Sequence, residues 1–244
     1  MSFLKAEWRK LILVNYVIDP HVLLPYLPPK TELDLHNGKC IVSLVGFKFV
    51  NTRMLGFKIP FHINFEEVNL RFYVKHKAEN EWKRGVVFIK EIVPKRAISI
   101  VANTIYKEHY ETCKMRHLWK ETEDEYTINY GWRKNGKWQE MEVTSDKTPF
   151  KINPDDVHEV GSLESDIAFI TEHYWGYTKI NSEKSFEYEV THPVWDAYPV
   201  KSCKVSVDFG LVYGSDFAHL NTKEPLSVML AEGSEITVEK AVRV

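Results

Sequence analysis

Three polar side chains occupy alternate positions in one short segment of this chain. Glu67, Asn69 and Arg71 alternate with apolar residues within positions 65–74. Alternation with a period of two is typical of a β-strand, so the three side chains share one face. A guanidinium can hold a carboxylate or carbonyl oxygen, and a glutamate can carry a proton. The row therefore predicts one of two structures, the wall of a polar cavity or a solvated face of an antiparallel sheet.

The two interpretations assign different roles to the same residues. In a cavity, Arg71 would bind an anionic or carbonyl ligand, and Glu67 would supply a hydrogen bond or transfer a proton. In a closed structural network, Arg71 would instead neutralise Glu67. We expect the row to face the interior, because the apolar side chains between its members can pack under a helix or a partner subunit.

Two further motifs contain residue types that can line such a site. The segment Glu172-His173-Tyr174 lies at the end of a predicted helix, and His192-Pro193-Val194-Trp195 interrupts a predicted strand. Each also has a structural interpretation, a helix cap with a buried tyrosine for the first and a strand end with a packed tryptophan for the second. The adjacent charges of Lys95-Arg96 would lower the pKa of an amine and favour Schiff-base chemistry. This pair lies off the apolar stripe of a predicted helix, so we expect it to be solvated.

The elements that must position these residues are mostly strands. Alternation and turn signals predict strands over 11–17, 32–35, 40–50, 65–74, 85–89, 127–143, 186–190 and parts of 204–242, with hairpin turns at Asn37-Gly38 and Asn135-Gly136. Helical spacing and caps predict short helices over about 20–27, over 95–107, and from Ser162 or Ser165 with Leu163, Ile167, Ile170 and Tyr174 on one stripe. The pattern predicts a mainly β (α+β) chain, a single antiparallel domain spanning 1–244 with a few short helices.

The composition limits the classes of partner. The net charge is −2, with charges of both signs interspersed, which argues against nucleic acid or an anionic membrane as a partner. No apolar run approaches the roughly 18 residues of a membrane-spanning helix, and no signal-peptide core is present. The three cysteines and ten histidines lack the spacing of a disulfide framework or a metal site. Standard catalytic and phosphate-binding motifs are lacking too. We therefore expect a cytoplasmic protein without a metal or cofactor.

The ordered set of motifs resembles the YqjF-like family of uncharacterised bacterial proteins, a domain of unknown function. The resemblance extends over nearly the whole chain and rests on Trp8 to Val14, Asp19-Pro20, Leu27-Pro28-Pro29, Leu33-Asp34, Asn37-Gly38-Lys39, the 65–74 strand, Gly85 to Phe88, Tyr110, Met115, Phe169 with 172–174, and 192–195. This family is similar to acetoacetate decarboxylase, which implies an antiparallel β-barrel-like domain with an internal cavity. That enzyme forms a Schiff base through one of two adjacent lysines, with glutamate and arginine near the substrate.

Compared residue by residue, the chain departs from the enzyme at its reactive lysine. That position falls at Tyr110, which cannot form an iminium, while Glu67 matches one of the enzyme's glutamates. The enzyme's arginine near the N-terminus is replaced by Val17, and His173 stands where the YqjF-like family has an arginine. The resemblance therefore implies the fold without decarboxylation by the Schiff-base route.

Taken together, the residues and the resemblance predict a protein that binds a small carboxylate or carbonyl compound in an internal polar cavity. The predicted lining residues are Glu67, Asn69, Arg71, Tyr110, Met115, His173, Tyr174, His192 and Trp195. A second hypothesis is a lysine-independent lyase or isomerase, with Glu67 as general base and Tyr110 or His192 as acid. A third is a non-catalytic structural protein, for example a homodimer, whose polar row forms a closed network. Whether any reaction is catalysed stays open at this point.

Overall fold

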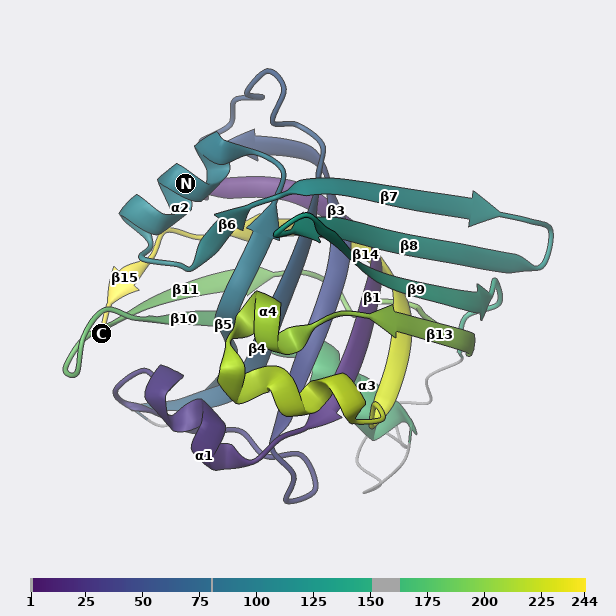
Figure 1. Ribbon diagram of the computed structural model, residues 1–244. Coiled ribbons are helices and arrows are strands. Elements are labelled where there is room, and N and C mark those ends of the chain that lie inside the picture. The colour runs from purple at the N-terminus through teal and green to yellow at the C-terminus, as the bar shows by residue number, and fades with distance from the viewer. Residues whose placement is uncertain (1, 80, 151–162) are drawn as a thin grey trace.

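The computed structural model describes all residues except 1, 80 and 151–162, and it is built mainly from antiparallel strands (Figure 1). The larger sheet contains β1 (Leu4–Val17), β2 (Thr31–Leu33), β3 (Ile41–Met54), β4 (Phe65–Ala78), β5 (Glu81–Val93), β6 (Tyr110–Thr112), β10 (Trp175–Lys179), β11 (Ser185–Thr191), β12 (Ala197–Tyr198), β14 (Ser227–Val238) and β15 (Val242–Arg243). The smaller sheet contains β7 (Lys114–Glu121), β8 (Glu125–Lys134), β9 (Lys137–Asp146) and β13 (Val200–Ser206). The predicted mainly β fold is confirmed.

The strands of the larger sheet close into a ring. The order β14-β1-β3-β4-β5-β10-β11 is completed by the pairing of Val190 with Val238, which joins β11 back to β14. All pairings are antiparallel except those of β5 with β10 and with β6. Closure matters for the predicted polar row because β4 belongs to the ring, and one face of each strand of a closed ring points into a shared interior.

The helices in the described ranges are short. They are α1 (Pro20–Leu23), η1 (Leu24–Tyr26), α2 (Arg96–Ile105), α3 (Leu163–Thr171), α4 (Phe209–Tyr213) and η3 (Ser215–Thr222). As predicted, Asp19 caps α1, accepting a hydrogen bond from the His21 N–H (2.9 Å), and Pro20 occupies the first helical position. None of the helices that the structure describes is long and apolar enough to cross a membrane.

The two faces of β4 belong to different hydrophobic clusters. Val68, Leu70, Phe72 and Val74 pack in the cluster that also holds the inner face of the smaller sheet and α4. Tyr73 packs in the second cluster, which contains side chains of α3. The strict alternation of the sequence is therefore confirmed, and it separates an apolar face from the face that carries the polar row.

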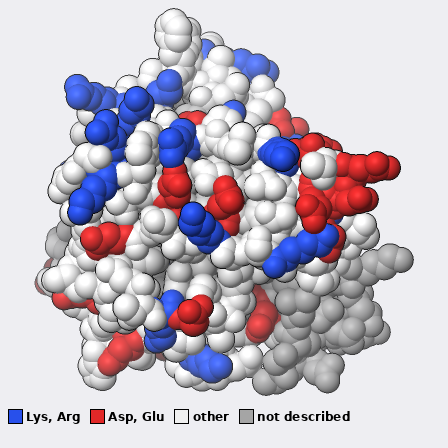
Figure 2. All heavy atoms as spheres, turned by 45° about the vertical axis from the view of Figure 1, so that its right-hand side comes forward, with Lys and Arg blue, Asp and Glu red and all other residues white. Residues whose placement is uncertain are grey.

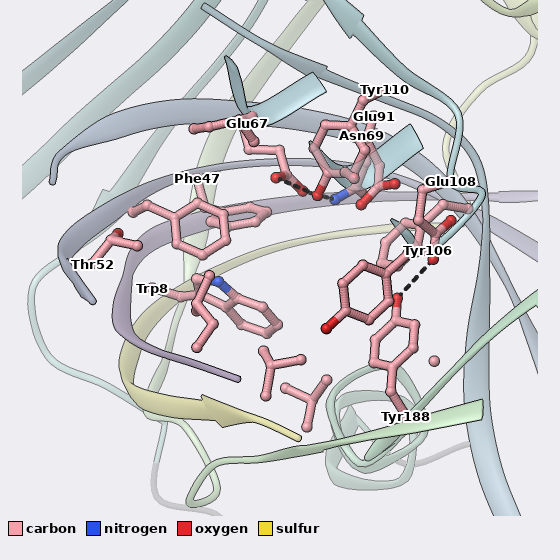
Figure 3. A pocket seen from close by; sticks show the side chains of 18 of the residues that line it. Trp8, Phe47, Thr52, Glu67, Asn69, Glu91, Tyr106, Glu108, Tyr110 and Tyr188 are labelled. Atoms are coloured by element: carbon pink, nitrogen blue, oxygen red, sulfur yellow. Dashed lines mark hydrogen bonds between the residues drawn. The ribbon is translucent and has the colours of Figure 1, made fainter. Parts of the chain in front are cut away.

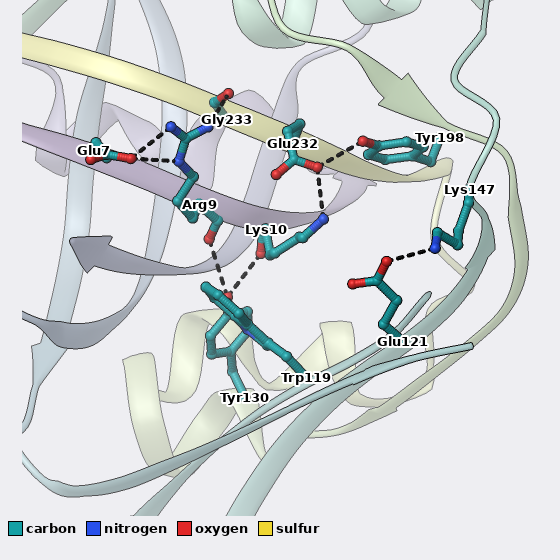
Figure 4. Close-up of polar contacts among 10 residues, drawn as sticks. All are labelled: Glu7, Arg9, Lys10, Trp119, Glu121, Tyr130, Lys147, Tyr198, Glu232 and Gly233. Atoms are coloured by element: carbon teal, nitrogen blue, oxygen red, sulfur yellow. Dashed lines mark hydrogen bonds and ion pairs between the residues drawn. The ribbon is translucent and has the colours of Figure 1, made fainter. Parts of the chain in front are cut away.

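A β-bulge ties the smaller sheet to the ring (Figure 4). Lys10 has a positive φ of 54°, and the register of β1 with β3 shifts at this point. The hydroxyl of Tyr130 donates to the main-chain oxygens of Lys10 (2.9 Å) and Arg9 (3.3 Å), while the indole N–H of Trp119 donates to that hydroxyl (3.0 Å). The carbonyl groups that the bulge removes from the ladder thus find a buried partner.

Several predicted elements differ from the structure. The Asn37-Gly38 turn forms, but β2 pairs with β4 and not with β3, because β4 extends past the start of β3 and offers a free edge at Val74–His76. The region predicted as strands over 204–242 also contains α4 and η3. Asp208 caps α4 by accepting from the Leu211 N–H (3.0 Å). The predicted helix near 165 is confirmed as α3, but Tyr174 lies beyond its end, and the Ser162 cap lies outside the described residues.

Charged side chains are mixed over the surface. Figure 2 shows basic and acidic groups side by side on the face it presents, with one acidic group towards its right-hand edge. Exposed apolar side chains are also present, and the connection between β3 and β4 holds two of the most exposed, Phe57 (76% exposed) and Phe61 (87%).

Candidate functional site

A cavity of about 240 Å³ lies on the inner face of the ring (Figure 3). Most of its wall is apolar. The aromatic side chains of Trp8 and Phe47 lie on one side, with ring centroids 5.2 Å apart. The apolar stripe of α2 supplies Ala97, Ile98, Val101 and Ala102. This arrangement explains why an amphipathic helix lies next to the ring: its apolar face closes the cavity.

The polar row of β4 lines this cavity. Glu67, Asn69 and Arg71 are 3%, 1% and 8% exposed, so the prediction that they face the interior is confirmed. The polar face of β4 points into the closed ring, and its apolar face packs under the smaller sheet and α4, so a pattern typical of a wet surface is buried here.

Two neighbouring strands extend the row with the predicted Tyr110 and with Glu91, which the sequence pattern did not indicate. Glu91 of β5 lies opposite Asn69 of β4, and Tyr110 of β6 lies opposite Glu91. Side chains at directly paired positions share a face and lie within contact distance. Asn69, Glu91 and Tyr110 therefore form a polar row across three strands, at right angles to the row along β4.

Hydrogen bonds join these groups into a cluster. The Asn69 amide donates to Glu67 Oε1 (3.0 Å), and the Tyr110 hydroxyl donates to Glu67 Oε2 (3.3 Å). Tyr110 is also within hydrogen-bonding reach of Glu91. A third carboxyl, that of Glu108, accepts from the hydroxyls of Thr178 and Tyr188, the latter at 3.1 Å.

The three carboxyls share a buried, acidic environment that disfavours their ionised forms. Burial and the neighbouring negative charge raise the pKa of Glu67 to about 7, against hydrogen bonds from Asn69 and Tyr110 that lower it. Burial also raises the pKa of Glu108 to about 7. The pKa of Glu91 lies well above its ordinary value, because of burial and the charges of the other two. Glu67 and Glu108 can therefore hold and release protons near neutral pH.

Glu108 reaches the cluster through a gap in the ring. On the same edge of β5, β10 pairs only with Gly85 and Val86, and β6 pairs only from Glu91 onward. Glu108 immediately precedes β6 and lines the cavity, and it also lines a second hollow of about 310 Å³. Glu108 thus separates the two hollows.

Arg71 is separated from the acidic cluster. Its Nη2 donates to the Ile170 carbonyl (3.3 Å), its Nε has no partner, and it forms no ion pair with Glu67. Four residues along a strand span about 13 Å, and the charge of Arg71 lowers the pKa of Glu67 less than the hydrogen bonds from Asn69 and Tyr110 do. The closed Arg71–Glu67 pair considered from the sequence is not present.

His173 is buried beside Arg71 and is uncharged at neutral pH. Burial lowers the pKa of His173 to about 4, although a hydrogen bond between its Nε2 and Asp34 Oδ2 (3.1 Å) opposes this shift. Asp34 is held by Arg84, whose Nε donates to the same oxygen (2.7 Å). His173 Nδ1 has no partner and therefore offers an acceptor at the cavity wall.

The motif at 192–195 places two stacked rings at the cavity wall. The rings of His192 and Trp195 are stacked 4.2 Å apart, and both side chains line the cavity. Burial lowers the pKa of His192, and its Nδ1–H donates to the Pro193 carbonyl (2.9 Å). Tyr174 packs against the outer side of His192, with centroids 4.9 Å apart, and is not among the lining residues.

Of the remaining predicted lining residues, Met115 is placed elsewhere. It lies on β7 and packs against the cluster on the opposite face of the ring.

The residues that line the cavity in the described part of the chain include no lysine, and Lys95 lies outside the wall at the start of α2. No group of His, Cys, Asp and Glu arranged to hold a metal is found among the described residues.

Buried polar atoms without a partner are concentrated at this cavity. Six such atoms in the described residues belong to lining side chains: Trp8 Nε1, Thr52 Oγ1, Asn69 Oδ1, Arg71 Nε, Glu91 Oε2 and His173 Nδ1. Buried polar groups are almost always paired, so a set of unpaired ones around one cavity needs a reason. Polar groups of a bound small molecule would pair them.

Comparisons with known proteins agree with the fold. A family model of DUF2071, described as an uncharacterised conserved protein, matches residues 5–235. The uncharacterised protein YqjF of Bacillus subtilis (strain 168) is 26% identical over 196 residues, which cover 79% of this chain and 74% of that protein.

Two solved structures have the same fold at low sequence identity. Acetoacetate decarboxylase from Legionella pneumophila has a TM-score of 0.64 and 13% identity, covering 99% of this chain and 86% of that chain. The enduracididine biosynthesis enzyme MppR, complexed with pyruvate, has a TM-score of 0.63 and 12% identity, covering 100% and 91%. The predicted acetoacetate decarboxylase-like fold is confirmed by both.

Proposed function

The chain belongs to the DUF2071 family of uncharacterised conserved proteins, and from that premise we propose that its cavity binds a small carboxylate or carbonyl compound. One observation carries the proposal: Arg71 is 8% exposed, lines the cavity, and has an unpartnered Nε. A buried guanidinium with an unused donor is strongly favoured to bind a carboxylate or carbonyl oxygen.

The size and lining of the cavity suit a small organic molecule. Ligand sites are mostly apolar with a few convergent polar groups, and this cavity has that composition. The structure of MppR, which has the same fold, contains pyruvate, a small keto acid. That likeness supports the ligand class, while the residues of this chain decide how it would bind.

We further propose that the chain does not use a Schiff base. Tyr110 stands on the wall where the resemblance to acetoacetate decarboxylase puts the reactive lysine, and no lysine is among the described lining residues. The tyrosine hydroxyl has no nitrogen to condense with a ketone, and burial raises its pKa well above the ordinary value.

Calorimetry with a matched pair of ligands tests the binding proposal. Phenylpyruvate and the neutral benzyl methyl ketone differ in the carboxylate that Arg71 would bind. We expect phenylpyruvate to bind, benzyl methyl ketone to bind more weakly, and Arg71→Met to remove most of the difference. Arg53→Met is the control, because Arg53 is exposed on β3 next to the lining residue Thr52. Equal binding of both ligands by the wild type, or no binding of either, would refute the proposal.

An enzyme is the second candidate, and the cluster around Glu67 favours it. Glu67 has a pKa of about 7 and is hydrogen-bonded to Tyr110, so it can accept a proton near neutral pH. A lysine-independent lyase or isomerase would use Glu67 to take a proton from the carbon next to a carbonyl. We would then expect the protein to exchange that proton of phenylpyruvate for solvent deuterium faster than buffer alone, and Glu67→Gln to abolish the excess. Exchange at the buffer rate would exclude this candidate for that ligand.

The non-catalytic alternative retains one supporting feature, the exposed apolar connection between β3 and β4. Phe57 and Phe61 are among its most exposed side chains, and a second copy of the chain is a partner that would cover them. Sedimentation of the wild type against a Phe57→Ser, Phe61→Ser variant tests a homodimer. A wild type that sediments as a monomer at high concentration excludes it.

Cytoplasmic localisation is proposed from the thiols. Cys40 and Cys113 are buried and Cys203 is exposed, and all three are unpaired. Free cysteines fit a reducing compartment. Fractionation of cells that produce the tagged protein tests this assignment.

A further inference from the structure

When its carboxyls are ionised, the acidic end of the cavity has more hydrogen-bond acceptors than donors. The Asn69 amide and the hydroxyls of Tyr110 and Tyr188 are all directed at carboxylate oxygens already. Asn69 Oδ1 and Glu91 Oε2 remain without a donor, in side chains that are 1% and 3% exposed. In Figure 3 these two side chains lie next to each other, in the same group as Glu67 and Tyr110. A protonated Glu91 can donate its own proton to the Asn69 oxygen. Once Glu91 is ionised, an occupant that adds acceptors leaves both atoms unpaired, whereas one that brings N–H groups pairs them.

The distribution of charge leads to the same ligand class. Glu67, Glu91 and Glu108 come from three different segments, and none of them forms an ion pair with a described lysine or arginine. Arg71, the arginine among the described lining residues, hydrogen-bonds Ile170 instead. Carboxylates that are buried without a cation are costly, and a second anion placed among them would increase that cost.

We propose that the acidic end of the cavity binds the protonated amino group of an organic amine, with N–H groups donated to Glu91 and Asn69. The apolar body of the amine lies against Trp8 and Phe47, the aromatic side of the same cavity. This inference rests on the proposed function, because it assumes that the cavity admits a small ligand. It adds a second polar group to that ligand: a compound with an acidic or carbonyl group at Arg71 and an amino group at Glu91 would use both ends.

Matched neutral and charged probes test the proposal. Phenethylamine and phenethyl alcohol have the same shape, and only the first carries a charge. We expect phenethylamine to bind the wild type about tenfold or more tightly than the alcohol at about pH 8, because the charge-assisted hydrogen bonds are lost in the alcohol. Equal affinities, or tighter binding of the alcohol, would overturn the proposal.

The pH dependence of binding provides a second readout. The titratable and charged groups that line the cavity of the bound amine are Glu67 and Arg71 from β4, Glu91 from β5, Glu108 from the segment before β6, Tyr110 from β6, Tyr188 from β11, Tyr106 from the end of α2, and the histidines His62, His173 and His192. The alkylammonium stays protonated, so the carboxyls are the groups that must lose protons when it binds. We expect affinity for phenethylamine to rise from about pH 6 to about pH 8, by up to about tenfold per pH unit for each proton released. Calorimetry at about pH 7 in two buffers of different ionisation enthalpy should detect this proton release. Affinity that is constant or falls over this range would contradict the proposal.

A pair of variants tests whether Glu91 is the carboxyl that binds the amine. Glu91→Gln keeps the shape of the side chain and removes one charge, and we expect it to weaken phenethylamine about tenfold without changing the alcohol. Glu66→Gln is the control, since Glu66 belongs to the same strand as Glu67 but contacts His117 on the other side. Equal effects of the two variants would overturn the assignment. If Glu91→Gln fails to fold, proton release by the wild type still decides the question. Binding of phenylpyruvate without binding of phenethylamine would overturn this inference and leave the proposed function in place.

Discussion

Replacing Glu108 by glutamine should stabilise the protein at about pH 8 and leave its stability almost unchanged at about pH 5. Glu108 is 7% exposed, and its Oε1 accepts hydrogen bonds from Thr178 and Tyr188. Glutamine retains that oxygen in nearly the same place, so the variant keeps both hydrogen bonds. It removes only the charge that the wild type must bury once the carboxyl ionises.

The size of this stability difference follows from the pKa of Glu108. Burial raises the pKa of Glu108 from 4.5 to about 7, so the folded state holds a proton that the unfolded state has already lost between these values. The free energy of unfolding contributed by this group therefore falls as the pH rises from about 4.5 to about 7, by about 3 kcal/mol in total. The glutamine variant lacks this loss. Its advantage over the wild type should be nearly absent at about pH 5 and largest at about pH 8.

Other groups titrate with the opposite sign, among them His173. Burial lowers the pKa of His173 from 6.5 to about 4, so the unfolded state binds the extra proton and stability rises with pH in that range. This contribution is common to the wild type and the variant, and it cancels in their difference. The quantity to compare is therefore the difference in the free energy of unfolding, measured by urea denaturation at several pH values.

The control variant should respond in the opposite direction. Burial alone would raise the pKa of Glu66, but the hydrogen bond to His117 and the charge of Lys48 hold it below its usual value. Ionised Glu66 therefore stabilises the fold, and Glu66→Gln should be less stable than the wild type at about pH 8. If Glu108→Gln instead differs from the wild type by the same amount at every pH, the carboxyl does not titrate near neutrality, and the account of the cluster is refuted.

Three further predictions concern other parts of the site. Borohydride reduction in the presence of acetoacetate should give no stable mass increase at Lys107 or Lys114, the lysines nearest to Tyr110 in the sequence; mass spectrometry of the peptides checks this. Arg71→Met should lower the free energy of unfolding by only about 0–1.5 kcal/mol in urea, because it removes one long hydrogen bond and no ion pair; a loss of about 3–5 kcal/mol would indicate a structural ion pair. Gly176→Ala should destabilise the fold by about 1–3 kcal/mol in the same assay, because its Cβ would lie 2.2 Å from the Tyr188 ring; an unchanged midpoint would show that this ring can move aside.

The fold was largely predictable because its signals are local. Alternation in β4 and the Asn135-Gly136 turn each depend on a few consecutive residues, and both are confirmed. The pairing of β2 with β4 was not predictable in the same way. It depends on how far β4 extends past β3, a relationship between segments that are distant in the sequence. Tertiary packing decides such pairings, and local turn chemistry does not.

The site was predicted only where it follows a single strand. The row of Glu67, Asn69 and Arg71 has a regular spacing, so its shared face could be read from the sequence. Glu91 and Glu108 lie far from that row in the sequence, at positions that no regular spacing connects with it. Glu91 joins it through the antiparallel pairing of β4 with β5, and Glu108 through the gap between β6 and β10, and only the folded chain defines both.

A single bulge decides the charge of the cavity wall. Along β5, strict alternation from Val86 and Phe88, which line the cavity, would place Lys90 on the same face. The register with β4 shifts between Leu70 and Arg71, so that Arg71 pairs with Phe88 and Leu70 with Lys90.

The consequence is an exchange of a lysine for a glutamate. Lys90 points to the other face, where its Nζ contacts Glu111 (3.1 Å), while Glu91 enters the cavity. A one-residue shift of register turns side chains over to the opposite face of a sheet. Without the bulge, an amine would stand beside Asn69, where a Schiff base or an ion pair to Glu67 could form. With it, the wall holds three carboxyls and no lysine in its described part, which suits a ligand that brings its own nitrogen.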